Sequence, residues 1–104
     1  MSVVTNVILS FSASEIDLDD DYLDVIARVN KFFPVGAGFK RSVDETAGGT
    51  KHMERPTFCG AFNYLDLEGF SKHLSNLPWK YPENVQLFVC EQDDEVYRQV
   101  ELFQ

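Results

Sequence analysis

The 104 residues of this chain include 17 acidic and nine basic side chains, for a formal net charge of −8 at pH 7. A field of that sign repels the phosphates of nucleic acids and the headgroups of anionic lipids, and it attracts basic proteins. The acids gather at the two ends of the chain, around a near-neutral middle. The composition therefore predicts a basic protein partner and argues against nucleic-acid and membrane binding.

An apolar fraction of 44%, with nine Phe, four Tyr and one Trp, is typical of one folded domain, expected over residues 1–104. The first eleven residues lack the basic start of a signal peptide and are too short to span a membrane. With only Cys59 and Cys90, no disulfide framework is predicted. We expect a cytoplasmic protein with two separate, buried thiols.

Residues 3–12 alternate with period two and are rich in β-branched side chains, which predicts a strand. Residues 22–33 carry apolar side chains at spacings of three and four, which predicts an amphipathic helix. Asp19 is its expected N-cap, Asp20 and Asp21 suit the positive end of its dipole, and the Pro- and Gly-containing stretch 34–38 ends it.

The next elements are a short edge strand at residues 39–44, a Gly-containing loop at 45–56 and a strand at 57–64. Gly60 in that strand would allow a helix to pack closely above it.

A second helix begins after Asp66 as its N-cap and carries an apolar stripe from Leu67 to Leu77. Trp79 and Tyr81 are expected to fold back on the core. Alternating residues at 85–90 and 96–102 predict a closing hairpin.

This order of elements is that of an α+β, ferredoxin-like split βαβ sandwich. It predicts a mainly antiparallel sheet of about five strands with two helices on one face and the first strand at the centre. Cys59 and Cys90 would then lie two strands apart, beyond disulfide reach. The alternative is another α+β sandwich in which the same elements pair differently.

The aspartates 17, 19 and 21 match the first, third and fifth positions of an EF-hand calcium loop. The sixth position needs glycine and has Tyr22, and the twelfth needs glutamate and has Arg28. The strand at 57–64 has Ala61 where an RNA-recognition sheet needs a stacking aromatic ring, with no Lys or Arg beside it. We predict no metal, no cofactor and no nucleic-acid ligand.

Catalysis by a thiolate would require Cys59 or Cys90 beside His52 or His73, and no spacing supports such a pair or a zinc site. His73 lies off the apolar stripe of its helix and is expected to be solvated. His52, with its basic neighbours Lys51 and Arg55, could hold an anion, but a solvated polar loop is the favoured explanation of these residues. The sequence thus favours a binding protein over an enzyme.

The face of the sheet away from the helices is predicted to be too apolar for full exposure to water, which suggests a second copy, another protein or a covering segment of the chain. We expect it to present Val4, Ile8, Cys59, Ala61, Phe88, Cys90, Tyr97 and Phe103.

The leading hypothesis is a small acidic module, of inhibitor or immunity type, that occludes a basic surface of a partner protein. Tyr22 and Tyr97 are the predicted anchors, and the predicted steering groups are Asp19, Asp20, Asp21, Asp93, Asp94 and Glu95. The alternative is a homodimeric small-ligand binder or small enzyme that uses the open sheet face as a cleft, with Cys59 or His52 taking part.

Overall fold

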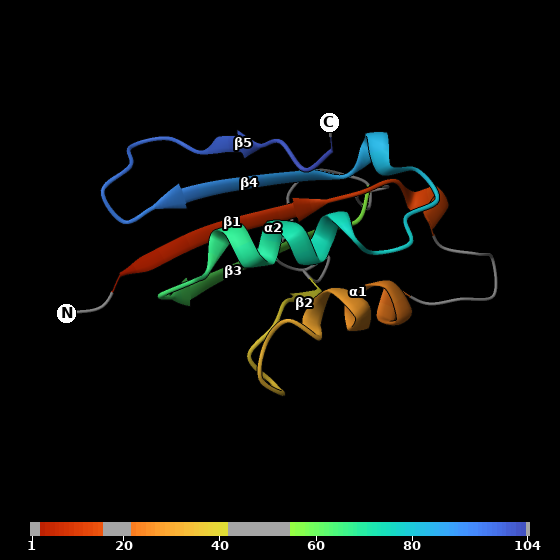
Figure 1. The fold of residues 1–104 in the computed structure, drawn as a ribbon, viewed down its shortest axis with the longest axis horizontal. Helices are drawn as coiled ribbons and strands as arrows, with labels where there is room; N and C mark the ends of the chain where they lie inside the picture. The colour runs from red at the N-terminus through yellow and green to blue at the C-terminus, as the bar shows by residue number, and fades with distance from the viewer. Residues whose placement is uncertain (1–2, 16–21, 42–54, 104) are drawn as a thin grey trace, which may run out of the picture.

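The computed structural model of this chain describes residues 3–15, 22–41 and 55–103, and within these it leaves the side chains of residues 22–24, 40 and 41 undescribed. The elements, in chain order, are β1 (Val4–Ser10), η1 (Ala13–Glu15), α1 (Tyr22–Asn30), β2 (Lys40–Arg41), β3 (Thr57–Asn63), α2 (Leu67–Ser75), η3 (Pro82–Asn84), β4 (Gln86–Glu91) and β5 (Arg98–Val100). Figure 1 shows α1 and α2 in front of the same sheet. The predicted α+β class is confirmed.

The sheet has the order β2-β3-β1-β4-β5, and every neighbouring pair is antiparallel. The predicted central position of β1, between β3 and β4, is confirmed. Four strands of three residues or more form the body of this sheet, rather than the predicted five, because β2 is reduced to a two-residue pairing with β3 at the edge. Residues 42–44 of the predicted edge strand lie outside the described residues.

The side chain of Asn30, at the end of α1, binds the residue just before β2. Its Oδ1 accepts from the main-chain N–H of Phe39 at 2.8 Å, and its Nδ2 donates to the main-chain oxygen of Phe39 at 2.9 Å. Both main-chain groups of Phe39 therefore have a hydrogen-bond partner in this side chain, which ties the end of α1 to the start of β2.

The first predicted helix ends earlier than expected, at Asn30 instead of Phe33. Phe32 and Phe33 follow it in a turn, in which Phe33 N donates to the oxygen of Asn30 at 2.9 Å. Their rings still pack against the core, and Phe32 lies 5.2 Å from Phe70 between ring centroids. The expected N-cap, Asp19, lies outside the described residues.

The second helix begins as predicted, because Oδ1 of Asp66 accepts from the N–H of Gly69 at 3.0 Å. Its two inward residues, Phe70 and Leu74, are fully buried. Trp79 folds back as predicted, and its Nε1 donates to the main-chain oxygen of Leu74 at 2.8 Å. The same prediction for Tyr81 was wrong, since that side chain is 41% exposed.

The core lies between the helices and one face of the sheet. It consists of Val7, Leu9, Phe11, Ile26, Val29, Phe39, Phe58, Phe70, Leu74, Val85, Leu87 and Val89. Gly60 lies at its margin, where the ring of Phe62, and not a helix as predicted, occupies the space above it. That ring stacks on Phe33 at 4.5 Å between centroids.

The other face of the sheet, called the open face below, has residues that alternate with those of the core along the strands. On β1, β3, β4 and β5, strand register places on it Val4, Asn6, Ile8, Ser10, Thr57, Cys59, Ala61, Asn63, Gln86, Phe88, Cys90 and Gln99. On β2, Lys40 is the register partner of Cys59. Phe103 was wrongly predicted there, since it packs against the core. Neither described helix has the length or apolar character needed to cross a membrane.

Candidate partner-binding surface at the hairpin end

The structure describes the side chains of four of the eight residues predicted to bind a partner, and all four lie in the connection between β4 and β5. Asp93, Asp94 and Glu95 are exposed there, and the side chain of Tyr97 is 46% exposed. Residues 19–21 lie outside the described part, and Tyr22 is the first residue of α1, with its side chain not described. Residues 92–97 are called the acidic turn below.

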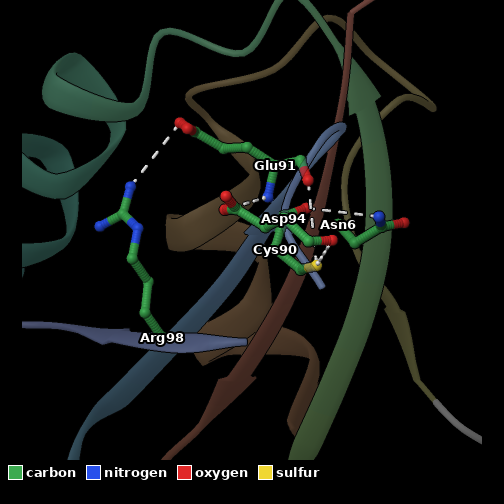
Figure 2. Close-up of polar contacts among 5 residues, drawn as sticks. All are labelled: Asn6, Cys90, Glu91, Asp94 and Arg98. Atoms are coloured by element: carbon green, nitrogen blue, oxygen red, sulfur yellow. Dashed lines mark hydrogen bonds and ion pairs between the residues drawn. The ribbon is translucent and has the colours of Figure 1, made fainter. Parts of the chain in front are cut away.

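Asp94 closes the acidic turn on the last residues of β4. Its main-chain N–H donates to the oxygen of Glu91 at 2.8 Å, and its Oδ2 accepts from the N–H of Glu91 at 3.0 Å. The thiol of Cys90 donates to the main-chain oxygen of Asp94 at 3.4 Å, as Figure 2 shows. One of the predicted steering acids therefore has a structural role in this turn.

Contacts with β1 fix the position of the acidic turn relative to the rest of the sheet. Oε1 of Gln92 accepts from the N–H of Val4 at 3.0 Å, and Nδ2 of Asn6 donates to the oxygen of Cys90 at 3.3 Å (Figure 2). At the other end of the turn, Arg98 lies 3.7 Å from Glu91, in an ion pair that is half exposed. The connection is thus held at both ends and is not a loose loop tip.

The surface of the acidic turn combines charge with apolar area. Between the exposed Asp93 and Glu95 and the start of β5 lie Val96, which is 74% exposed, and Tyr97. Exposed carboxylates attract a basic surface over about 8–10 Å in physiological salt. An adjacent aromatic ring supplies the kind of contact that dominates binding energy in protein interfaces.

Glu15 does not belong to the acidic surface, although it lies in the acidic N-terminal part of the sequence. It is 7% exposed, and its two carboxylate oxygens accept from the N–H groups of Lys80, at 2.7 Å, and Tyr81, at 2.8 Å. The carboxylate thereby joins η1 to the segment that follows α2. No local pattern predicts this contact, because the partners lie 65 and 66 residues away.

Two basic side chains named by the sequence also have structural contacts. His73 is half-buried, not solvated as predicted, and its Nε2 donates to the main-chain oxygens of Arg28 at 2.9 Å and Val29 at 3.1 Å. Arg55 is half-buried and donates from Nε to Oγ of Ser10 at 2.6 Å. The other two members of its predicted basic group, residues 51 and 52, lie outside the described residues.

The two cysteines are free and lie on β3 and β4, with β1 between them. Two strand spacings of about 4.8 Å keep the thiols beyond disulfide reach, as predicted. The prediction that both are buried was wrong, because Cys59 is exposed and Cys90 is half-buried. Both residues belong to the open face, where they alternate with core residues that point toward the helices.

Within the described ranges, no group of three or more His, Cys, Asp or Glu residues is arranged to hold a metal ion. Hollows lined by described residues include the following two. One lies around Glu15, Arg28 and Trp79, and the other around Phe33, Val35 and Phe39. Neither is lined by a residue of the open face, where a ligand cleft was the alternative expectation.

The chain matches no known protein family, no curated protein and no solved structure.

Proposed function

We propose that this chain is a small acidic protein-binding module, of inhibitor or immunity type, which occludes a basic surface of a partner protein in the cytoplasm. The observation that carries the proposal is the acidic turn, where exposed carboxylates adjoin exposed Val96 and Tyr97 on a connection anchored to β1. The free thiols at Cys59 and Cys90 suit a reducing compartment.

We further infer that the scaffold is a ferredoxin-like split βαβ sandwich. The strand order β2-β3-β1-β4, with α1 between β1 and β2 and α2 between β3 and β4, supports this arrangement. In it, β5 is an addition beside β4, and the acidic turn is the connection that introduces this added strand.

The charges of the acidic turn act mainly before contact. Because the chain carries a net charge of −8, a basic partner is attracted from a distance and its encounter rate increases. Asp93 and Glu95 belong to an exposed turn at the end of the sheet, so they suit this role. Exposed carboxylates of this kind change the association rate more than the dissociation rate.

Apolar contact then holds the complex together. Val96 and Tyr97 immediately precede β5, next to the Arg98–Glu91 ion pair, so the backbone beside them is already ordered before binding. We expect Tyr97 to be the larger contributor, because aromatic anchors are enriched among the residues that dominate interfaces.

The proposal is tested with two double variants that change the net charge equally. Asp93→Asn with Glu95→Gln neutralises the acidic turn and leaves the structural carboxylate of Asp94 in place. Glu68→Gln with Glu83→Gln neutralises two exposed acids on α2 and η3. Each variant and the wild-type chain is used to capture proteins from native lysate, with elution by a salt gradient.

We expect the wild-type chain and the Glu68/Glu83 variant to retain the same basic protein, released at high salt. The Asp93/Glu95 variant should associate with that protein about 3- to 10-fold more slowly at low salt and show a flatter salt dependence. Inhibition of the partner's own activity tests occlusion. Equal association rates for the two double variants, or no basic protein retained by the wild-type chain, would show the proposal to be wrong.

A further inference from the structure

The open face has an unusual composition for this chain. None of its twelve residues on β1, β3, β4 and β5 is charged, although 25% of the whole chain is charged. On the edge strand β2, Lys40 is the register partner of Cys59 and adds one basic residue to this row of the sheet. Ile8 and Phe88 face each other across β1 and β4 at its centre, with exposed Ala61 and Cys59 beside them on β3. A sheet face with this composition suits contact with protein better than contact with water.

The two ends of the open face differ in charge. At one end, the guanidinium of Arg55 lies across the strands, where it donates to Oγ of Ser10 at 2.6 Å, to Oε1 of Gln86 at 3.2 Å and to the main-chain oxygen of Asn84. At the other end, Cys90 contacts the acidic turn through the main-chain oxygen of Asp94. The face therefore has a cation at one end and carboxylates at the other.

We propose that the open face binds a second copy of this chain, with the two sheets stacked face to face and their strands running in opposite directions. A two-fold axis across the strands then brings the Arg55 end of each copy to the acidic turn of the other copy, so the same contact forms twice. Two copies that each carry a net charge of −8 repel elsewhere, and this face, whose strand residues include no Asp or Glu, lets them meet without opposing carboxylates.

The size of the face predicts a weak dimer. With strands about 4.8 Å apart and about 3.4 Å per residue, β3, β1, β4 and β5 cover roughly 14 by 24 Å. This area is well below the roughly 800 Å² that each partner buries in a stable complex. The two copies should therefore exchange rapidly and associate at tens to hundreds of micromolar, a range of roughly 5–6 kcal/mol in binding free energy.

The first experiment measures mass by sedimentation equilibrium, from about 5 µM to about 500 µM. The mass should rise from 11.9 kDa toward that of a dimer. Reaction of the Cys59 thiol with a disulfide reagent should slow several-fold over the same range, because the second copy covers it. A constant mass would overturn the proposal. Equal protection of the Cys59 thiol from the reagent at all concentrations would also overturn it, because the thiol would then be covered by its own chain and not by a second copy.

Variants identify the surface. Ala61→Glu places a carboxylate on an exposed position of the open face and should stay monomeric at all concentrations. Val35→Glu adds the same charge at a fully exposed site in the turn after α1, and it should dimerise like the wild-type chain. Gln99→Glu on β5 repeats the test should Ala61→Glu fail to fold. Equal dimerisation of the open-face and Val35 variants would overturn the assignment.

The orientation of the two copies is tested with the charge-matched double variants. Both lower the repulsion between copies, but only Asp93→Asn with Glu95→Gln removes the carboxylates that meet Arg55. That variant should dimerise more weakly than Glu68→Gln with Glu83→Gln. Equal dimerisation would overturn the antiparallel arrangement.

Discussion

Replacement of Glu15 by alanine is expected to destabilise the fold more than replacement of an exposed acidic residue would. The variant removes the acceptors for the N–H groups of Lys80 and Tyr81, which bond to the carboxylate at 2.7 and 2.8 Å. It also removes a side chain that is only 7% exposed and lines the hollow beside Trp79. The segment between α2 and η3 then loses its attachment to η1.

The size of the effect follows from these two hydrogen bonds. A bond to a charged acceptor contributes about 1.5–3 kcal/mol when buried. Lys80 and Tyr81 are themselves exposed, so water partly replaces the lost acceptor. The loss of stability is therefore about 1 kcal/mol or slightly more for each hydrogen bond. We expect a total loss of about 2–3 kcal/mol, which lowers Tm by roughly 10–20 °C in a domain of this size.

The measurement is urea unfolding of wild type, Glu15→Ala, Glu15→Gln and Glu83→Gln, followed by circular dichroism. Glu15→Gln should lie between wild type and alanine, because its one amide oxygen replaces two acceptors and its NH₂ group faces a donor. Glu83→Gln, at an exposed acid, gives the effect of lowering the net charge alone and should stay within about 0.5 kcal/mol of wild type. A loss below about 1 kcal/mol for Glu15→Ala would refute this reasoning.

Two further stability predictions concern a helix cap and a tight strand position. Asp66→Ala removes the acceptor for Gly69 N–H and should lower the free energy of unfolding in urea by about 1 kcal/mol. Asp66→Asn keeps an acceptor oxygen and should keep most of the stability. Equal losses in the two variants would contradict a capping role. Gly60→Ala places a methyl group 2.8 Å from the ring of Phe62 and should lower the free energy of unfolding by about 1–3 kcal/mol. Ala61→Ser, at the exposed neighbouring position, should change it little. No loss of stability in Gly60→Ala would show that the ring moves freely.

The elements that the sequence predicts well are those whose signals are local. The alternation in β1 and the Asp66 cap with its inward Phe70 and Leu74 depend on residues a few positions apart, and the structure confirms them. The end of α1 was missed because the side chain of Asn30, the last residue of the helix, binds the main chain of Phe39, nine residues later. That competition is tertiary, so helical periodicity alone does not show it.

The candidate site stays a prediction, and the structure adds which of its residues are exposed. Asp93, Glu95 and Tyr97 were identified from charge and aromatic character, and their exposure supports the choice. Asp94 was predicted for steering alone, while its hydrogen bonds with Glu91 also give it a structural role that charge does not indicate.

By itself, the sequence determined the α+β class, the order of the elements and the sign of the surface field. Periodicity and capping depend on residues close together in the chain, and net charge is a sum over all residues, so neither requires the tertiary structure. The tertiary structure decided which polar side chains serve the fold and which remain at the surface. Glu15, Arg55 and His73 have the same charge types as residues at exposed positions, but each bonds to groups 29 or more residues away. Such contacts exist only in the folded chain, because only the tertiary structure brings these distant groups within hydrogen-bond distance.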